Sequence, residues 1–454
     1  MSFLKKIAQK IGIDKSIAYS SGARIVQAFT GIVSIFFITG YLTGVEQGFY
    51  YTFGSILAIQ TFFELGLTGI ITQYVSHEAS HLEINEFGEY IGNEKYKSRL
   101  SSLLHFVVKW YSCVALLFFV TLVIVGFMFF EVNSNKDECI SWKVPWILLS
   151  IGTAIKLFQS PLSSFFMGLD KVKEMSKISF YQQLILPIST WIGLVCDLKL
   201  YVVGISSLLS VLIWFIYIAK TNMHSLIFKI WNVKVFFKIG YMEEIFPFQW
   251  RIALSALSGY FIFSFLNPVL FAYQGPVIAG QMGMTLSVLS AVQSFSMSWL
   301  NTKVPLYSRL IAIKDYSKLD SIFNKTMHQM VLVCCVLMLV VLVIISALQF
   351  LKISINGELL SARFLSGFTL IALIFAYLVD QFTFSWATYL RCHKREPFLW
   401  ISIFAGIGCC VSTYYTAKYS TVFVVSLSYC LVKLTGIPWG YAIFKKYKYL
   451  WHKI

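Results

Sequence analysis

Long apolar stretches recur along the whole of this 454-residue chain and constrain its fold more than any other feature. A helix needs roughly 20 mostly apolar residues to cross the hydrocarbon core of a bilayer. Twelve windows qualify, and the polar residues Asp197 and Lys199 separate the fifth from the sixth. We therefore predict an all-α integral membrane protein with about twelve transmembrane helices. The windows cover residues 18–42, 48–75, 103–130, 144–168, 178–198, 200–219, 248–274, 277–300, 327–351, 364–390, 398–417 and 421–444.

Charged residues are scarce in this sequence. They make up 13% of the chain, whereas soluble domains average about 25%. The formal net charge of +16 would suggest a nucleic-acid partner if the protein were soluble. Here the basic residues lie in short gaps between apolar windows, so we interpret them as topology signals and as contacts for anionic lipid headgroups. We expect no nucleic-acid partner and no cofactor.

Basic residues are distributed unevenly between alternate loops. Of the 37 Lys and Arg residues, 26 lie in the termini and one set of loops, six lie in the other set and five lie within windows. In membrane proteins the cytoplasmic loops carry the excess of Lys and Arg. We therefore expect a multi-pass protein of the cytoplasmic membrane with both termini on the cytoplasmic side.

A basic cytoplasmic loop, residues 220–247, divides the windows into two sets of six. We predict two six-helix bundles, residues 1–219 and 248–454, with this loop as the linker. The first and seventh windows begin alike, because Arg24 and Arg251 are each followed by a glycine seven or eight residues on. Parallel repeats around a central cavity are a known transporter architecture. The alternative is that window ends resemble one another without true repetition.

Seven charged side chains lie inside the windows, where each costs about 2.5–3.5 kcal/mol at the bilayer centre unless it faces water or an opposite charge. Lys109 and Arg251 lie near cytoplasmic ends and can extend toward the headgroups. Five positive and two negative charges leave the interior at +3. Such an interior suits an anionic group such as a pyrophosphate. The seven residues are Arg24, Glu64, Lys109, Lys156, Arg251, Asp380 and Lys433.

Polar residues at 3- and 4-residue spacing accompany three of these charges, which puts each set on one helix face. The first window carries Gln27 and Ser34, the second Gln60 and Thr68, and the fourth Thr153 and Ser160. We predict that these six residues line a hydrophilic cavity. The alternative is that Glu64 forms a buried ion pair with a Lys or Arg and only holds helices together.

The seventh window contains proline and many aromatic residues. Pro268 removes a backbone donor from the helix, so we predict a kink there. The aromatic side chains of the seventh and eighth windows have two interpretations: they stack on sugar rings, or they face lipid.

His77, Glu78 and His81 form a literal H-E-x-x-H sequence, the pattern of zinc metalloproteases. A zinc site needs a third protein ligand, and the Asp-Gly pair that intramembrane proteases of this type supply is absent from the chain. We interpret the pattern as a chance occurrence and expect no metal site. The chain also lacks a P-loop, so we do not expect it to hydrolyse ATP.

Three segments carry a family resemblance. Residues 48–78, GFYYTFGSILAIQTFFELGLTGIITQYVSHE, resemble the second span of bacterial polysaccharide repeat-unit flippases (Wzx-type O-antigen translocases). Residues 247–287, PFQWRIALSALSGYFIFSFLNPVLFAYQGPVIAGQMGMTLS, resemble the same family, and residues 391–397, RCHKREP, resemble its basic turn after the tenth span.

The resemblance implies membership of the multidrug/oligosaccharidyl-lipid/polysaccharide (MOP) exporter superfamily, with two six-helix bundles around a central cavity. The implied substrate is an undecaprenyl-pyrophosphate-linked oligosaccharide, moved by alternating access from the cytoplasmic to the periplasmic leaflet of the bacterial inner membrane. It also implies coupling to H⁺ or Na⁺, and a polysaccharide polymerase and a chain-length regulator as partners. Two alternatives remain: a small-molecule antiporter of the same superfamily, or a polytopic enzyme acting on lipid-linked sugars.

Under this hypothesis the basic residues inside the windows bind the substrate. Arg24 and Arg251 bind pyrophosphate near the cytoplasmic entrance, and Lys156 and Lys433 continue the cationic path. Glu64 and Asp380 pair with the lysines or carry coupling protons.

Charge reversal at Arg24 and Arg251 tests the cationic path. Acidic residues there would repel the pyrophosphate, so we expect surface polysaccharide to disappear while the protein stays in the membrane. Surface polysaccharide and membrane protein are both measured by immunoblotting. Normal polymer made by the reversed variant would contradict the hypothesis.

Overall fold

A computed structural model describes most of the chain, and its described residues are almost entirely helical. Two short antiparallel hairpins are the described β structure: β1 (Leu82–Ile84) with β2 (Tyr90–Gly92), and β3 (Ser354–Ile355) with β4 (Glu358–Leu359). The predicted all-α membrane class is confirmed by this helical content and by the long apolar helices described below. The described residues are 30–31, 33–64, 66–85, 90–133, 140–221, 223–237, 240, 246–355, 358–393 and 397–452.

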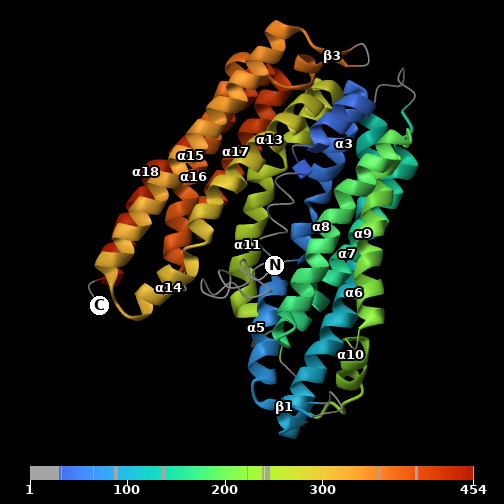
Figure 1. Cartoon of the computed structure of the whole chain (residues 1–454), viewed down its shortest axis with the longest axis vertical. Coiled ribbons are helices and arrows are strands. Elements are labelled where there is room, and N and C mark those ends of the chain that lie inside the picture. The colour runs from blue at the N-terminus through green and yellow to red at the C-terminus, as the bar shows by residue number, and fades with distance from the viewer. Residues whose placement is uncertain are drawn as a thin grey trace, which may run out of the picture. The chain divides into compact units, whose positions relative to one another are not determined.

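The helices group into two compact units (Figure 1). The first unit comprises residues 1–30, 59–132 and 137–256. In its described part, α7 and α8 both pack on α9. Its helices are α4 (Gln60–Glu64), α5 (Leu67–Ala79), α6 (Glu94–Asn133), α7 (Lys143–Gly168), α8 (Val172–Val195), α9 (Tyr201–Lys220), α10 (Met223–Trp231) and the start of α11 (Phe246–Phe263).

The second unit comprises residues 31–58, 133–136 and 257–454. Within it α16 packs along α18, and α3 packs along α13. Residues 33–41 are also helical. Its helices are α3 (Gly44–Leu57), α12 (Leu266–Gln274), α13 (Pro276–Asn301), α14 (Val304–Ala312), α15 (Tyr316–Leu351), the 3₁₀ turn η2 (Leu360–Arg363), α16 (Gly367–Arg391), α17 (Leu399–Tyr419) and α18 (Val422–His452).

Eight helices in the described part of the chain are long and apolar enough to cross a membrane, or nine if Gly44–Glu64 and Leu67–Ala79 form one span. They correspond to nine of the twelve predicted windows, and most of the first window lies outside the described residues. The fourth and eighth windows form α7 and α13, which are 26 residues each but are not among those eight or nine helices. Polar residues lower the hydropathy of both.

Two predicted chain breaks are confirmed. Asp197 and Lys199 adopt left-handed backbone conformations, with φ of 56° and 44°, and end α8 before α9 begins. The seventh window is interrupted at Ser264 and Phe265, between α11 and α12. The break begins four residues before Pro268, because a proline cannot donate a hydrogen bond to the carbonyl group of the fourth residue back.

The predicted single helix over 48–75 is wrong. The chain forms three helices there, α3, α4 and α5, with a left-handed residue, Gly66 (φ 67°), immediately before α5. Gln60 and Glu64 therefore share a face of α4, whereas Thr68 belongs to α5. The 4-residue spacing continues through the break, so spacing alone does not reveal that the helix ends.

Residues 31–58 pack within the second unit, although the sequence places them in the predicted first bundle. Close approach of α3 to α13 explains this packing. A Cβ atom built at Gly48 would lie 2.1 Å from the carbonyl oxygen of Pro276, and one built at Gly280 would lie 2.8 Å from the Gly48 nitrogen. Only glycine allows the two backbones to come this close. The predicted bundle boundaries at 219 and 248 stay a prediction.

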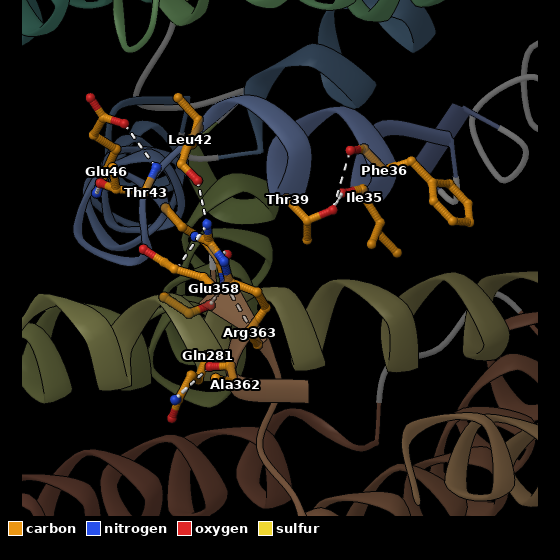
Figure 2. Close-up of polar contacts among 12 residues, drawn as sticks. Ile35, Phe36, Thr39, Leu42, Thr43, Glu46, Gln281, Glu358, Ala362 and Arg363 are labelled. Atoms are coloured by element: carbon orange, nitrogen blue, oxygen red, sulfur yellow. Dashed lines mark hydrogen bonds and ion pairs between the residues drawn. The ribbon is translucent and has the colours of Figure 1, made fainter. Parts of the chain in front are cut away.

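A buried arginine joins the start of α3 to the turn before α16 (Figure 2). Arg363 is 4% exposed and donates to the carbonyl oxygen of Leu42 (2.5 Å) and to Oε1 of Gln47 (3.3 Å). Its guanidinium also pairs with Glu358 at 3.0 Å. Gln47 in turn donates to the carbonyl oxygens of Gly280 (2.9 Å) and Arg363 (3.1 Å). These bonds compensate the cost of burying a guanidinium.

The α3–α13 contact predicts opposite effects for two alanine substitutions on α3. Gly48→Ala should destabilise the fold by about 1–3 kcal/mol, because the new methyl group meets the rigid Pro276 backbone. Gly54→Ala should stabilise it by about 0.4–1 kcal/mol, because a Cβ there has no atom within 4 Å. Thermal unfolding of the purified variants in detergent measures both. Equal melting temperatures for the two variants would contradict this packing.

Candidate functional site

A polar cavity of about 490 Å³ lies inside the first unit. Helices α5, α7, α8 and α9 supply its lining. Most of the lining side chains are hydroxyls or amides, which both donate and accept hydrogen bonds. The lining residues are Thr68, Lys156, Gln159, Ser160, Ser163, Ser164, Met167, Met175, Ser176, Ile178, Ser179, Gln182, Gln183 and Trp214.

Lys156 supplies the charge of this cavity. It is the one charged residue among the described lining residues, and its side chain is exposed. Glu64 lies close enough to interact electrostatically with it. Glu64 is half-buried and accepts a hydrogen bond from Nε2 of Gln60 at 2.7 Å. The cavity therefore combines one cation, one nearby carboxylate and many neutral hydrogen-bonding groups.

Hydrogen bonds between helices hold the cavity wall in place. Gln159 Nε2 on α7 donates to the carbonyl oxygen of Val211 on α9 at 3.0 Å. Trp214 Nε1 on α9 donates to Oγ of Ser163 on α7 at 2.8 Å. Gln182 Nε2 on α8 donates to the carbonyl oxygen of Ser210 on α9 at 3.1 Å. These hydrogen bonds keep α7, α8 and α9 together around a hydrophilic space.

Four of the six predicted polar residues can be placed relative to the cavity. Thr68 and Ser160 line the cavity with Lys156, and Gln60 binds Glu64 beside it. Thr153 is buried, donates to Leu149 of its own helix and is not among the lining residues.

The remaining predicted site residues lie in the second unit or outside the part of the chain that the structure describes. Ser34 is helical and belongs to the second unit. Arg24 and Gln27 lie outside the described residues, as does the side chain of Arg251, whose backbone is part of α11. Their predicted roles stay predictions.

The α8 side of the cavity was not among the residues predicted from the sequence. Ser176, Ser179 and Gln183 line it and recur at 3- and 4-residue spacing. This is the same spacing that identified the stripes in the other windows. This stripe has no charged residue among these three positions, but its hydroxyls and amides are as polar as those of α7.

In the second unit, Lys433 of α18 forms an ion pair with Asp380 of α16. Both residues are buried, at 5% and 6% exposure. The Lys433 ammonium also lies over the rings of Phe263 (4.7 Å), Tyr377 (5.4 Å) and Tyr429 (4.5 Å). Its charge is thus compensated by one carboxylate and three aromatic faces. In this arrangement Lys433 does not offer a free cation to a substrate.

The H-E-x-x-H residues have structural contacts instead of a ligand geometry. Glu78 is 2% exposed, and its Oε1 accepts from Nε of Arg99 at 3.0 Å, which ties α5 to α6. Helix α5 ends at Ala79, so His81 lies beyond it and stacks on Tyr96. Among the residues that the structure describes, no group of three His, Cys, Asp or Glu side chains could hold a metal ion.

The Asp380–Lys433 pair predicts a strong double-mutant coupling. Lys433→Met or Asp380→Asn alone should destabilise the fold by about 3–5 kcal/mol, because each leaves a buried polar partner uncompensated. The double variant should recover most of this loss. Denaturant unfolding in mixed micelles measures the cycle. Lys448 lies on α18 like Lys433 and forms a partly exposed pair with Asp320 of α15. Lys448→Met should therefore cost about 1 kcal/mol or less. Additive effects at 380 and 433 would contradict the pairing.

Comparison with solved structures identifies the fold. One similar structure is an inward-facing multidrug resistance MATE family transporter of the MOP superfamily, with a TM-score of 0.70, 11% identity and coverage of 93% of this chain and 98% of that chain. Another is the lipid II flippase MurJ in an inward closed conformation, with a TM-score of 0.59, 12% identity and coverage of 94% and 87%. A MOP superfamily transporter from Pyrococcus furiosus has a TM-score of 0.52.

Comparison of the sequence alone assigns the chain to no family. No protein-family profile matches the chain, and no curated protein is similar to it in sequence. Because the structural similarities combine full-length coverage with low identity, they establish the architecture alone. The chain has the all-α membrane fold of MATE and MOP superfamily transporters.

Proposed function

We propose that this protein is a flippase that moves undecaprenyl-pyrophosphate-linked oligosaccharide repeat units across the bacterial inner membrane. The observation that supports this most is the polar cavity of the first unit, in which Lys156 is the one charged residue among the described lining residues. A charged side chain within a membrane-spanning region that is not neutralised by a buried partner points to a binding site. Because this charge is positive and accessible, an anionic group is its natural ligand.

The chemistry of the cavity matches the two polar parts of such a substrate. The Lys156 ammonium offers a point charge for a pyrophosphate oxygen. The hydroxyls and amides around it, such as Ser179 and Gln183, offer donors and acceptors for sugar hydroxyls. The fold supports the same function, since MurJ, described as a lipid II flippase, shares it.

Coupling to an ion gradient has a candidate group in Glu64. Its carboxylate interacts electrostatically with Lys156, so protonation of Glu64 would leave the lysine charge less compensated and favour the anionic substrate. A ligand can drive a conformational change only through different affinities for the two states. We propose H⁺ or Na⁺ as the coupling ion, with both termini cytoplasmic and a polysaccharide polymerase and chain-length regulator as partners.

A small-molecule antiporter is the second candidate. The structure with a TM-score of 0.70 belongs to a multidrug resistance transporter, and a 490 Å³ cavity is large enough for a drug-sized ligand. The lysine argues against the cationic compounds that many such exporters carry, because like charges repel. Transport assays with a drug panel and with lipid-linked sugar separate the two candidates.

Substitution of Lys156 tests the proposed function. Lys156→Gln should weaken binding of a polyprenyl-pyrophosphate-linked oligosaccharide about 10- to 100-fold, because a charge-assisted contact worth about 1.5–3 kcal/mol is lost. Lys156→Arg should retain most of the binding. Native mass spectrometry of purified protein measures the affinity, and reconstituted vesicles measure translocation.

Lys143→Gln on the same helix is the matched control. Lys143 lies at the first residue of α7 and pairs with the exposed Glu131 outside the cavity. It should bind and translocate the lipid-linked sugar like the wild type. If Lys156→Gln also behaves like the wild type, or if the wild type transports a soluble drug and no lipid-linked sugar, the proposed function is wrong.

A further inference from the structure

A second cavity, of about 530 Å³, lies within the second unit. Helices α3, α11, α12, α13 and α16 contribute to it. Its volume is in the range of small-molecule binding sites. The lining residues are Tyr51, Gly54, Ser55, Phe263, Ser264, Asn267, Gly283, Leu286, Ser287, Ser290, Gln293, Tyr377 and Phe384.

The lining combines aromatic rings with neutral polar groups. Tyr51, Phe263, Tyr377 and Phe384 provide ring faces, and the other polar lining residues are serines and carboxamides. None of the described lining residues is charged. The apolar C–H face of a sugar ring packs against an aromatic ring, and its hydroxyls bond to groups that both donate and accept. A pyrophosphate, in contrast, finds no cation in this lining.

Asn267 shows that the cavity has unused hydrogen-bonding capacity. It is 3% exposed, and its Oδ1 has no hydrogen-bond partner within the described part of the chain. A buried acceptor without a partner is destabilising, because it has lost its hydrogen bonds to water. Glycine at position 283 makes room for this side chain, since a Cβ there would lie 2.6 Å from Asn267 Nδ2 and 2.3 Å from Tyr51 Cβ. A ligand hydroxyl that donates to Oδ1 would remove the cost.

The neighbouring ion pair disfavours a cationic ligand. The Lys433 ammonium already lies over the rings of Phe263 and Tyr377, two of the aromatic walls. A ring face that already stabilises one cation offers less attraction to a second one. A lipophilic drug cation therefore fits this cavity less well than an uncharged ligand.

We propose that this second cavity is a binding site for uncharged sugar rings. Its assignment to the oligosaccharide part of a lipid-linked substrate rests on the proposed function. The second cavity recognises neutral sugars by ring packing and by hydrogen bonds to Asn267 and Ser290. Ser290 is already oriented by its hydrogen bond with the Tyr377 hydroxyl, at 2.9 Å.

Two matched probes test this proposal on the full chain in phosphatidylcholine nanodiscs. One is farnesyl pyrophosphate, and the other is farnesyl pyrophosphate carrying a neutral disaccharide. We expect Asn267→Leu and Ser290→Ala each to weaken binding of the sugar-bearing probe about 3- to 10-fold, as expected for a neutral hydrogen bond. Neither should change binding of farnesyl pyrophosphate.

The control variant is Ser296→Ala. Ser296 lies on α13 like Ser290, but it bonds to Val292 of its own helix and does not line the cavity. It should bind both probes like the wild type. Because Asn267 Oδ1 has no partner among the described residues, Asn267→Leu should also melt no lower than the wild type. Ser290→Ala decides the binding question if the leucine variant fails to fold.

Three results would overturn the sugar site. The first is unchanged binding of the sugar-bearing probe by both cavity variants, and the second is equal weakening of both probes. The third is that the cavity variants lose binding of the lipophilic cation tetraphenylphosphonium and keep binding of the sugar-bearing probe. If neither pyrophosphate probe binds the wild type, the proposed function fails separately. Free maltose, followed by saturation-transfer NMR, then decides about the cavity. A maltose signal that Asn267→Leu and Ser290→Ala reduce supports the site, and a signal that is absent or unchanged contradicts it.

Discussion

Polar groups inside a bilayer must find partners within the protein or face water, because lipid supplies neither hydrogen bonds nor counter-charge. The charged residues of this chain meet this constraint in two ways. Asp380 and Lys433 neutralise each other deep in the second unit, and three aromatic rings cover the ammonium. Lys156 instead faces a cavity lined by hydroxyls and amides. A compensated charge stabilises a helix pair, whereas an accessible charge can bind a ligand.

The same constraint explains which helices depart most from ordinary transmembrane composition. Helices α7 and α13 are 26 residues long, yet neither is among the described helices apolar enough to cross a membrane. Each contributes five or more lining residues to one of the two cavities, α7 in the first unit and α13 in the second. In both helices the low hydropathy coincides with side chains that line a cavity. The two cavities differ in chemistry, since one contains a lysine and the other only neutral and aromatic groups.

Much of the architecture could be predicted from the sequence because helix length, charge bias and chain breaks are local properties. The left-handed residues Asp197 and Lys199 and the proline at 268 interrupt helices where the sequence analysis expected interruptions. The break before Gly66 was not predicted, because the 4-residue polar spacing continues through it. Thr153 shows the limit of spacing as evidence: it lies on the helix of Lys156, but it is buried and bonds to its own helix.

The sequence by itself determined the membrane class, the approximate positions of most spans and the candidate status of Lys156, Asp380 and Lys433, because the cost of placing charge in lipid is visible in composition alone. Only the tertiary structure decided which charge is compensated and which is accessible. It also brought Asn267, Ser290 and Tyr377 from three helices to one cavity, and it packed Gly48 against Pro276 across more than 200 residues of sequence. Such contacts depend on how helix faces meet in space, and periodicity within a single helix carries no information about its partner.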